Sequence, residues 1–402
     1  MHHTGSGSRL FRSQAFHYQA LRTMGHSVAS GANPGECLEA IRRIRDEDAE
    51  SWYASWHAFG EKCEKMSVAE GDAVSRGMDL LRASNYYRAS EFFLSPSDPR
   101  RLEAYRRSSG TFVRALQVLK IPHKLWKIPY DRVSLHAYYL PGDDDKPLIL
   151  ACGGYDSTLE ELFFWIGKAA RERGCPCIMF EGPGQSHMLR EYGVKFTHEW
   201  EKPLKMLLDY AEWEAPELAK RRKVILGVSM GGMLALRAAA RDKRIDAAAC
   251  FGGFFNMREA ALAQLPGLGR WLFRLGFEDV FNRLARLKAA RDIGRRWALT
   301  NGCWSMGGQT PFELLVKTGD YSVAPVAEEI TCNVLIVKGE RDHLIPSSDS
   351  ALFRKHITRA RTYREHTFTA ADGAGEHCQA GAVEQFHQVF FDWVEGLAAG
   401  RY

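Results

Sequence analysis

The sequence feature that most constrains the fold is a serine flanked by glycines between an apolar run and a helical run. Residues 227–232 read GVSMGG, which matches the pattern G-x-S-x-G. The apolar run at 224–226 predicts a strand, and the run MLALRA at 233–238 predicts a helix. A sharp turn between them leaves the Ser229 hydroxyl clear at the helix N-terminus. This context predicts a nucleophile, with an ordinary tight turn as the alternative.

Apolar and alternating runs predict a sheet around this turn. The run PLILAC at 147–152 is continuously apolar, which is typical of a strand covered on both faces. Further strands are expected at 124–130, 132–140, 175–180, 224–228, 247–251, 334–337 and about 365–369. Helical patterns fall near 158–172, 197–215, 231–241 and 380–398. This alternation indicates a mostly parallel, doubly wound sheet and, with the serine turn, the α/β-hydrolase fold.

Two helical additions to the sheet are expected. Trp52, Trp56 and Phe59 recur at spacings of four and three on one helix face, within a region of helical pattern. We therefore expect a helical N-terminal cap at 1–122, with residues 1–8 left out of the fold argument. The interval 252–332 far exceeds the dozen or so residues of a sheet crossover, so it predicts an inserted helical lid. The segments 123–251 and 333–402 then form the core.

Composition excludes several classes of protein. The chain has 402 residues, 45% of them hydrophobic, which is enough for a large core. The basic run at 220–223 lacks stacking aromatics, so it predicts a solvated helix end and no nucleic-acid partner. The nine cysteines show neither disulfide nor metal-ligand spacing. With no apolar leader and no apolar stretch of about 18 residues, we expect a cytoplasmic protein without membrane contact, metal or cofactor.

A serine nucleophile needs an acid and a base, which follow the serine along the chain in this fold. The run VLIV at 334–337 predicts a strand that ends near Asp342, the expected acid. A loop or capping aspartate, or Glu340 as the acid, are the alternatives.

The expected base is His377, in a glycine-containing loop that follows the last strand. His366 and His387 fall inside a predicted strand and helix and are expected to be structural. His343, adjacent to Asp342, would point away from it and is a poor candidate.

Two glycine-containing loops are expected at the same sheet edge. In the loop GGYDS at 153–157, the backbone N–H of Tyr155 is the expected second oxyanion donor beside that of Met230. Asp156 either binds a substrate hydroxyl or holds the loop. The turn EGPGQS at 181–186 lacks the G-K-[ST] ending of a phosphate loop, so we expect a tight turn at the rim of the site, with His187 on the surface.

Four segments together resemble a known family: NYYRASEFFL at 85–94, GGYDS at 153–157, EGPGQS at 181–186 and GEHCQ at 375–379. The combination is similar to the FrsA-like α/β-hydrolases that include 2,6-dihydroxypseudooxynicotine hydrolase and fungal hydrolases that shorten polyketide chains. The resemblance covers about residues 35–400. It implies a helical cap, cleavage of carbon–carbon bonds beside a ketone or of esters, and homodimers. The triad carries over onto Ser229, Asp342 and His377, while Glu181 stands where the family often has Asp.

The expected substrate is a β-diketone or acyl-aromatic, polyketide-like compound. Candidate pocket residues are aromatic or apolar: Tyr86 and Tyr87 in the cap, and Trp304, Met306 and Tyr321 in the lid region. Ordinary packing is the alternative for each. Hydrolysis of a carboxylester, lactone or thioester is the alternative function, and a non-catalytic scaffold would be expected to lack a triad member.

Overall fold

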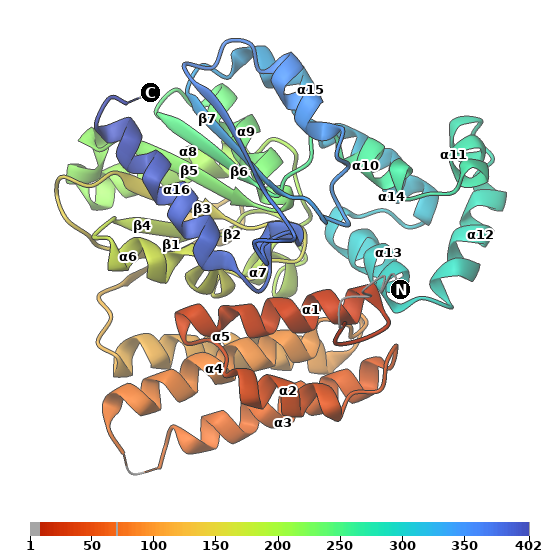
Figure 1. Cartoon of the computed structure of the whole chain (residues 1–402), viewed down its shortest axis with the longest axis horizontal. Coiled ribbons are helices and arrows are strands. Elements are labelled where there is room, and N and C mark those ends of the chain that lie inside the picture. The colour runs from red at the N-terminus through yellow and green to blue at the C-terminus, as the bar shows by residue number, and fades with distance from the viewer. Residues whose placement is uncertain (1–8, 70, 402) are drawn as a thin grey trace, which may run out of the picture. The chain divides into compact units, whose positions relative to one another are not determined.

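The computed structural model describes residues 9–69 and 71–401, which form two compact units (Figure 1). The helical unit contains the chain up to Ile121 and the segment 284–301. The sheet unit contains residues 122–283 and the chain from Gly302 onward. The chain leaves the sheet unit within α12 (Glu278–Ala289) and returns to it within α13 (Ile293–Met306). The interval 252–332, expected as one lid, is therefore divided between the two units.

A mostly parallel sheet forms the centre of the sheet unit. Its eight described strands lie in the order β1-β2-β4-β3-β5-β6-β7-β8. Their bounds are β1 Lys124–Tyr130, β2 Val133–Leu140, β3 Leu148–Cys152, β4 Cys177–Phe180, β5 Lys223–Val228, β6 Ala247–Phe251, β7 Asn333–Gly339 and β8 Tyr363–Phe368. The β1–β2 and β2–β4 pairs are antiparallel, and the other pairs are parallel. This is the α/β-hydrolase arrangement, so the fold prediction is confirmed.

Helices cover the sheet and explain its apolar strands. Strands β3, β4, β5 and β6 are buried along their whole length. The helices of this unit are α6 Lys168–Glu172, α7 Ser186–Arg190, α8 Glu201–Glu214, α9 Met230–Arg241, α10 Met257–Ala263, α11 Gly267–Arg274, α14 Pro311–Lys317, α15 Asp349–His356 and α16 Val383–Ala398. Helix α16 crosses the sheet in Figure 1 and stacks Phe386 on Phe251 of β6, with ring centroids 3.6 Å apart.

Short helical turns complete the description. One of them, η2 (Phe163–Gly167), is a π-helical turn that continues directly into α6, so the helix expected near 158–172 is irregular in its first half. The 3₁₀ turns are η1 His26–Ala29, η3 Pro216–Lys220, η4 Thr318–Asp320, η5 Ala324–Glu329 and η6 His377–Gln379.

The helical unit packs around an aromatic core. Its helices are α1 Gln14–Gly25, α2 Pro34–Arg42, α3 Ala49–Met66, α4 Ala73–Glu91 and α5 Pro99–Val118. Side chains of Asp48, Asp72 and Asp98 accept backbone hydrogen bonds at the starts of α3, α4 and α5, which satisfies N–H groups that a helix leaves open. Trp52 and Trp56 are fully buried in this core, as their helical spacing predicts.

The segment 284–301 is held to the helical unit by specific contacts. The ring of Trp297 stacks on Phe92 with centroids 4.5 Å apart. The guanidinium of Arg101 donates to Asn301 Oδ1 at 2.9 Å and pairs with Glu91 at 2.9 Å, with both charged side chains almost fully buried. These contacts explain why part of the sequence between β6 and β7 belongs with the N-terminal helices.

No helix in the described part of the chain is long and apolar enough to cross a membrane. All nine cysteines lie at described positions and are free thiols, and Cys303 is the most exposed of them.

Candidate active site

The turn between β5 and α9 presents Ser229 in a strained backbone conformation. Its φ of 59° and ψ of −129° are unusual for a residue with a side chain. The turn is so tight that a Cβ at Gly227 would stand 1.9 Å from the carbonyl oxygen of Gly231. Only glycine fits there, which explains the sequence pattern around the serine.

Three distant segments meet at this turn in one hydrogen-bonded chain. The Nε2 atom of His377 lies 2.9 Å from Ser229 Oγ, and its Nδ1 atom lies 2.7 Å from Asp342 Oδ2. Ser229 follows β5, Asp342 follows β7, and His377 begins η6 after β8. Because carboxyl ends of parallel strands share one sheet edge, the topology brings these side chains together.

The acid is fixed from its other side. The Oδ1 atom of Asp342 accepts backbone hydrogen bonds from Leu344 at 2.9 Å and Ile345 at 3.0 Å. This leaves Oδ2 for the imidazole. The carboxylate therefore has one orientation, set by three groups on two segments of chain.

Burial and charge act against each other at this pair. The side chains of His377 and Asp342 are each 3% exposed. Burial disfavours the imidazolium, but the adjacent Asp342 carboxylate and the Cys378 side chain together outweigh burial and raise the pKa of His377 well above its usual value. Burial likewise opposes the negative charge of Asp342. The contact with His377 and the hydrogen bonds from the two backbone N–H groups outweigh burial, so the pKa of Asp342 is lowered overall. The geometry thus favours an imidazole that accepts a proton from the serine.

A thiol also touches the imidazole. The Sγ atom of Cys378 lies 3.5 Å from His377 Nε2 and 3.4 Å from the carbonyl oxygen of Phe251. Cys378 has a φ of 50°, so the chain turns sharply directly after the histidine. The turn brings the thiol beside the nitrogen that faces Ser229, a contact that the sequence did not predict.

The rival acid and bases lie elsewhere. Glu340 is exposed and accepts a hydrogen bond from the backbone N–H of Ala370. The ring of His343 lies 6.4 Å from that of His377, with centroid measured to centroid. His387 Nε2 contacts the carbonyl oxygen of Trp165 at 2.7 Å, and His366 lies within β8.

The loop after β3 packs directly against the serine turn. A Cβ at Gly154 would stand 3.0 Å from both the Met230 nitrogen and Ser229 Cβ. Glycine therefore allows the loop backbone to approach the start of α9, where N–H groups are oriented along the helix axis. Tyr155, the next residue, packs its hydroxyl against Gly302, where a Cβ would meet it at 2.2 Å.

The turn EGPGQS is more than a rim feature, which the sequence analysis missed. The side chain of Gln185 donates to the carbonyl oxygens of Gly153 and Gly154 at 2.6 and 3.1 Å. Ser186 Oγ accepts a hydrogen bond from the backbone N–H of Leu159 at 3.0 Å. The sequence carried a signal for these contacts, because a side-chain amide in a turn beside the loop of a neighbouring strand is expected to hydrogen-bond to backbone groups there.

Glu181 is a buried carboxyl beneath this turn. Its two oxygens accept the backbone N–H groups of His136 at 3.1 Å and His187 at 2.7 Å. Burial nevertheless raises its pKa to about 8. The rings of His136 and His187 stack with centroids 4.0 Å apart, so His187 is half-buried and not the surface residue expected.

The candidate substrate residues are distributed over both units. Trp304 and Met306 follow Gly302, so their segment lies beside Tyr155. The backbone of this segment is also held by a hydrogen bond from Phe196 N–H to the carbonyl oxygen of Ser305 at 2.9 Å. Trp304 is half-buried and Met306 is 5% exposed.

Tyr321 and Asp156 complete the set in the sheet unit. Tyr321 is buried with its ring edge-on to His198, at 6.0 Å between centroids. Asp156 is half-buried in the loop after β3.

Tyr86 and Tyr87 are core residues of the helical unit. The hydroxyl of Tyr86 donates to Glu36 at 2.9 Å and accepts from the Asn33 N–H at 2.9 Å. The hydroxyl of Tyr87 donates to Glu64 at 2.8 Å. Both rings are fully buried, so the pair is used for packing within its own unit, the alternative that the sequence left open.

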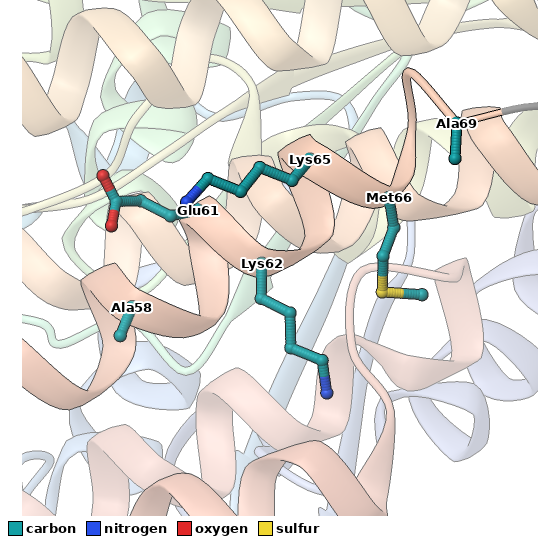
Figure 2. Close-up of a pocket in the computed structure, with 6 residues that line it drawn as sticks. All are labelled: Ala58, Glu61, Lys62, Lys65, Met66 and Ala69. Carbon is teal, nitrogen blue, oxygen red and sulfur yellow. The ribbon is translucent and has the colours of Figure 1, made fainter.

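The helical unit has surface hollows of its own. The one in Figure 2 lies along α3 and is lined by Ala58, Glu61, Lys62, Lys65, Met66 and Ala69. Figure 2 shows Lys62 and Met66 on one side of the helix and the side chain of Lys65 reaching toward Glu61. Among the described residues, no group of three or more His, Cys, Asp or Glu side chains is arranged to hold a metal ion.

Comparison with known proteins shows which family the chain is similar to. The family described as "Serine aminopeptidase, S33" matches residues 177–371. Hydrolase acrC of Aspergillus aculeatus is 30% identical over 421 residues, which cover 96% of this chain and 97% of acrC. The 20-hydroxy-prefusarin hydrolase FUS2 of Gibberella moniliformis is 32% identical over 413 residues, which cover 97% of this chain and 98% of FUS2.

A solved structure supports the fold. The crystal structure of 2,6-dihydroxy-pseudo-oxynicotine hydrolase superposes with a TM-score of 0.73 at 21% identity, covering 94% of this chain and 96% of that one. The resemblance drawn from the four sequence segments is therefore confirmed.

Proposed function

The chain belongs to the α/β-hydrolase family of these fungal relatives and is a hydrolase, and we propose that it works as a serine hydrolase with Ser229 as nucleophile, His377 as base and Asp342 as acid. The observation that carries the proposal is the continuous hydrogen-bonded chain from Ser229 Oγ through the imidazole to Asp342, with steps of 2.9 and 2.7 Å.

Each side chain has a distinct role in this proposal. His377 removes the Ser229 proton as the oxygen attacks a carbonyl carbon. Asp342 holds the imidazole with its proton on Nδ1 and stabilises the imidazolium that forms. The raised pKa of His377 fits this role, because the imidazole must hold the proton until the leaving group takes it.

The oxyanion that develops needs donors placed in advance. We propose that the backbone N–H groups of Met230 and Tyr155 supply them. The close approach of Gly154 to Met230 and Ser229 supports this assignment, since it brings the loop backbone to the side of the nucleophile.

The proposed bond is a carbon–carbon bond beside a ketone in a β-diketone or acyl-aromatic, polyketide-like compound. Ser229 Oγ would add to the ketone carbon, and the adduct would collapse with the electron pair leaving on carbon as an enolate or a stabilised aryl carbanion. The proton taken from Ser229 would pass from His377 to that carbon. Water would then attack the acyl carbon in place of the leaving group, with His377 taking the water proton and returning it to Ser229 Oγ. The near full-length relative FUS2 is named as the hydrolase of one compound, 20-hydroxy-prefusarin, which supports a small-molecule substrate for this chain.

Hydrolysis of a carboxylester, lactone or thioester is the second candidate. The matched family is described as a serine aminopeptidase, which points to cleavage between an acyl carbon and a heteroatom. The same three side chains serve that reaction with less demand on the leaving group. In either reaction Asp156, Trp304, Met306 and Tyr321 stay our candidate substrate contacts in the sheet unit.

Parallel assays separate the two candidates. The wild-type protein, Ser229→Ala and the exposed-serine control Ser27→Ala would each receive p-nitrophenyl acetate and 1-phenyl-1,3-butanedione. We expect wild type and Ser27→Ala to cleave the diketone into one carboxylic acid and one ketone, and Ser229→Ala to lose this activity. Ester cleavage without diketone cleavage would favour the second candidate. Full activity of Ser229→Ala on both compounds would contradict serine catalysis.

The assembly and location expected from the sequence are part of the proposal. We propose a cytoplasmic homodimer that needs no cofactor. Light scattering of the purified protein would give a mass near 91 kDa for a dimer, twice the 45.4 kDa of one chain, and a monomeric mass would contradict it.

A further inference from the structure

The side chain of Gln185 joins two loops at the candidate active site. Its Nε2 atom donates to the carbonyl oxygens of Gly153 and Gly154, at 2.6 and 3.1 Å. Its Oε1 atom accepts the backbone N–H of Gly182 at 3.2 Å. Gln185 is 3% exposed, so the amide is withdrawn from water and uses both ends on backbone groups.

These bonds fix the direction of a peptide plane. The carbonyl of Gly154 and the N–H of Tyr155 belong to the same peptide group, which is planar and trans, so they point in opposite directions. Holding the carbonyl oxygen toward Gln185 therefore turns the Tyr155 N–H away from Gln185. A rotation of this peptide would take the N–H away from its place.

The same loop packs against the serine turn. A Cβ at Gly154 would stand 3.0 Å from Ser229 Cβ and from the Met230 nitrogen, and one at Gly231 would stand 2.5 Å from the carbonyl oxygen of Gly153. The loop thus contacts both the Gln185 amide and the start of α9. Ser186 adds a second tie at the far end of the loop through Leu159.

We propose that Gln185 is a positioning residue that orients the Gly154–Tyr155 peptide so that the Tyr155 N–H faces the oxyanion formed at Ser229. This inference rests on the proposed serine mechanism. It assigns the turn after β4 to catalysis although no atom of Gln185 needs to touch the substrate. The role requires an amide, because one nitrogen must donate to two carbonyls while the oxygen accepts from Gly182.

The test uses a fluorophosphonate probe, whose reaction needs no knowledge of the substrate. Ser229 Oγ forms a bond to phosphorus, fluoride leaves, the serine proton passes to His377, and the phosphoryl oxygen occupies the oxyanion site. The labelling rate would be measured for wild type, Gln185→Ala and Gln185→Glu, with KM and kcat for p-nitrophenyl acetate. Asn333→Ala is the matched control, since its buried amide donates to the Asp246 carbonyl oxygen and accepts from Thr362 at the amino end of β7.

We expect Gln185→Ala to lower the labelling rate and kcat by about 10- to 100-fold with KM little changed, a large part of the loss seen when one oxyanion donor is removed. Asn333→Ala should lose thermal stability and keep the wild-type labelling rate. In Gln185→Glu, the protonated carboxyl can donate one hydrogen bond to a carbonyl, whereas the ionised form repels both. Its rate relative to wild type should therefore rise as pH falls, and the corresponding ratio for Gln185→Ala should stay flat.

The outcomes separate this inference from the mechanism beneath it. Labelling of Ser229→Ala at the wild-type rate would overturn the serine mechanism itself. If Ser229→Ala is not labelled but folded Gln185→Ala reacts within twofold of wild type, the mechanism stands and the positioning role is wrong. An equal loss in Asn333→Ala would also overturn the role, because the effect would then reflect general loosening. If Gln185→Ala does not fold, the pH ratio of Gln185→Glu decides: a flat ratio contradicts the inference.

Discussion

Replacing Asp342 by asparagine should reverse the imidazole tautomer and remove most of the activity. The structure fixes which way the new amide faces. Two backbone N–H groups, of Leu344 and Ile345, donate to Oδ1, so an amide nitrogen there would lose both of these hydrogen bonds. The amide oxygen must therefore take the Oδ1 place, and its nitrogen must face His377 Nδ1.

The consequence is a base with its proton on the wrong nitrogen. Because the amide nitrogen donates, Nδ1 must accept, and the ring proton moves to Nε2, 2.9 Å from Ser229 Oγ. An imidazole in that state cannot remove the serine proton. The corresponding change in a serine protease lowers kcat about 10⁴-fold, which is about 5.5 kcal/mol in activation free energy, and we expect a loss of this order.

The assay is the rate of fluorophosphonate labelling of Asp342→Asn across pH. In the wild type, the raised pKa of His377 means that reactivity falls as pH drops through a value above 6.5. Without the carboxylate, burial of the ring dominates and lowers that pKa, so the acid limb of the residual activity should move to lower pH.

Asp349→Asn is the matched control for this prediction. Asp349 is also buried and accepts a backbone N–H, that of Phe255 at 2.7 Å, and the asparagine oxygen can keep this bond. Its labelling rate should match wild type. A rate for Asp342→Asn within tenfold of wild type, with the acid limb unmoved, would refute the reasoning.

Three further predictions follow from single contacts. Gly154→Ala should push the loop away from the serine turn and lower kcat for p-nitrophenyl acetate about 10- to 100-fold. The control Gly110→Ala lies within α5, where a Cβ meets no neighbour, so it should keep its activity and gain about 0.5–1 kcal/mol in free energy of unfolding by urea. Equal kcat values for the two variants would contradict this prediction. The pKa of Glu181 is raised in the folded state, so its contribution to stability is complete below the unfolded pKa of 4.5 and is lost as pH rises toward about 8. In Glu181→Gln, the fall in unfolding free energy between these pH values should be less steep, by up to about 1.4 kcal/mol per pH unit. An unchanged slope would disprove this prediction. Arg101→Ala leaves the Glu91 carboxylate buried without this partner and should destabilise the helical unit by about 3–5 kcal/mol. A thermal unfolding midpoint equal to that of wild type would contradict this and show that the pair is not buried in solution.

The fold was predictable because its determinants are local in sequence. Strand β3 is a continuous apolar run, and the turn around Ser229 combines a strand, glycines and a helix within a dozen residues. The three members of the hydrogen-bonded chain could be placed because each lies in the turn or loop that follows a predicted strand. Topology then does the rest, since it brings the ends of β5, β7 and β8 to one edge.

The parts that escaped prediction depend on contacts between distant segments. The surroundings of Tyr86 are set by Glu36 and Asn33, some 50 positions earlier, and nothing in the local pattern reveals them. Trp297 joins the helical unit through a stack on Phe92, and the periodicity of the sequence does not predict this contact. Gln185 was visible as a polar residue in a turn, but its two carbonyl partners belong to the loop after another strand.

The site of fluorophosphonate attachment tests the central claim most directly. Proteolysis and mass spectrometry of the labelled full chain should find one adduct, on the peptide that contains Ser229, and none on Ser229→Ala. Attachment elsewhere, or a folded wild-type protein that is not labelled, would contradict the account.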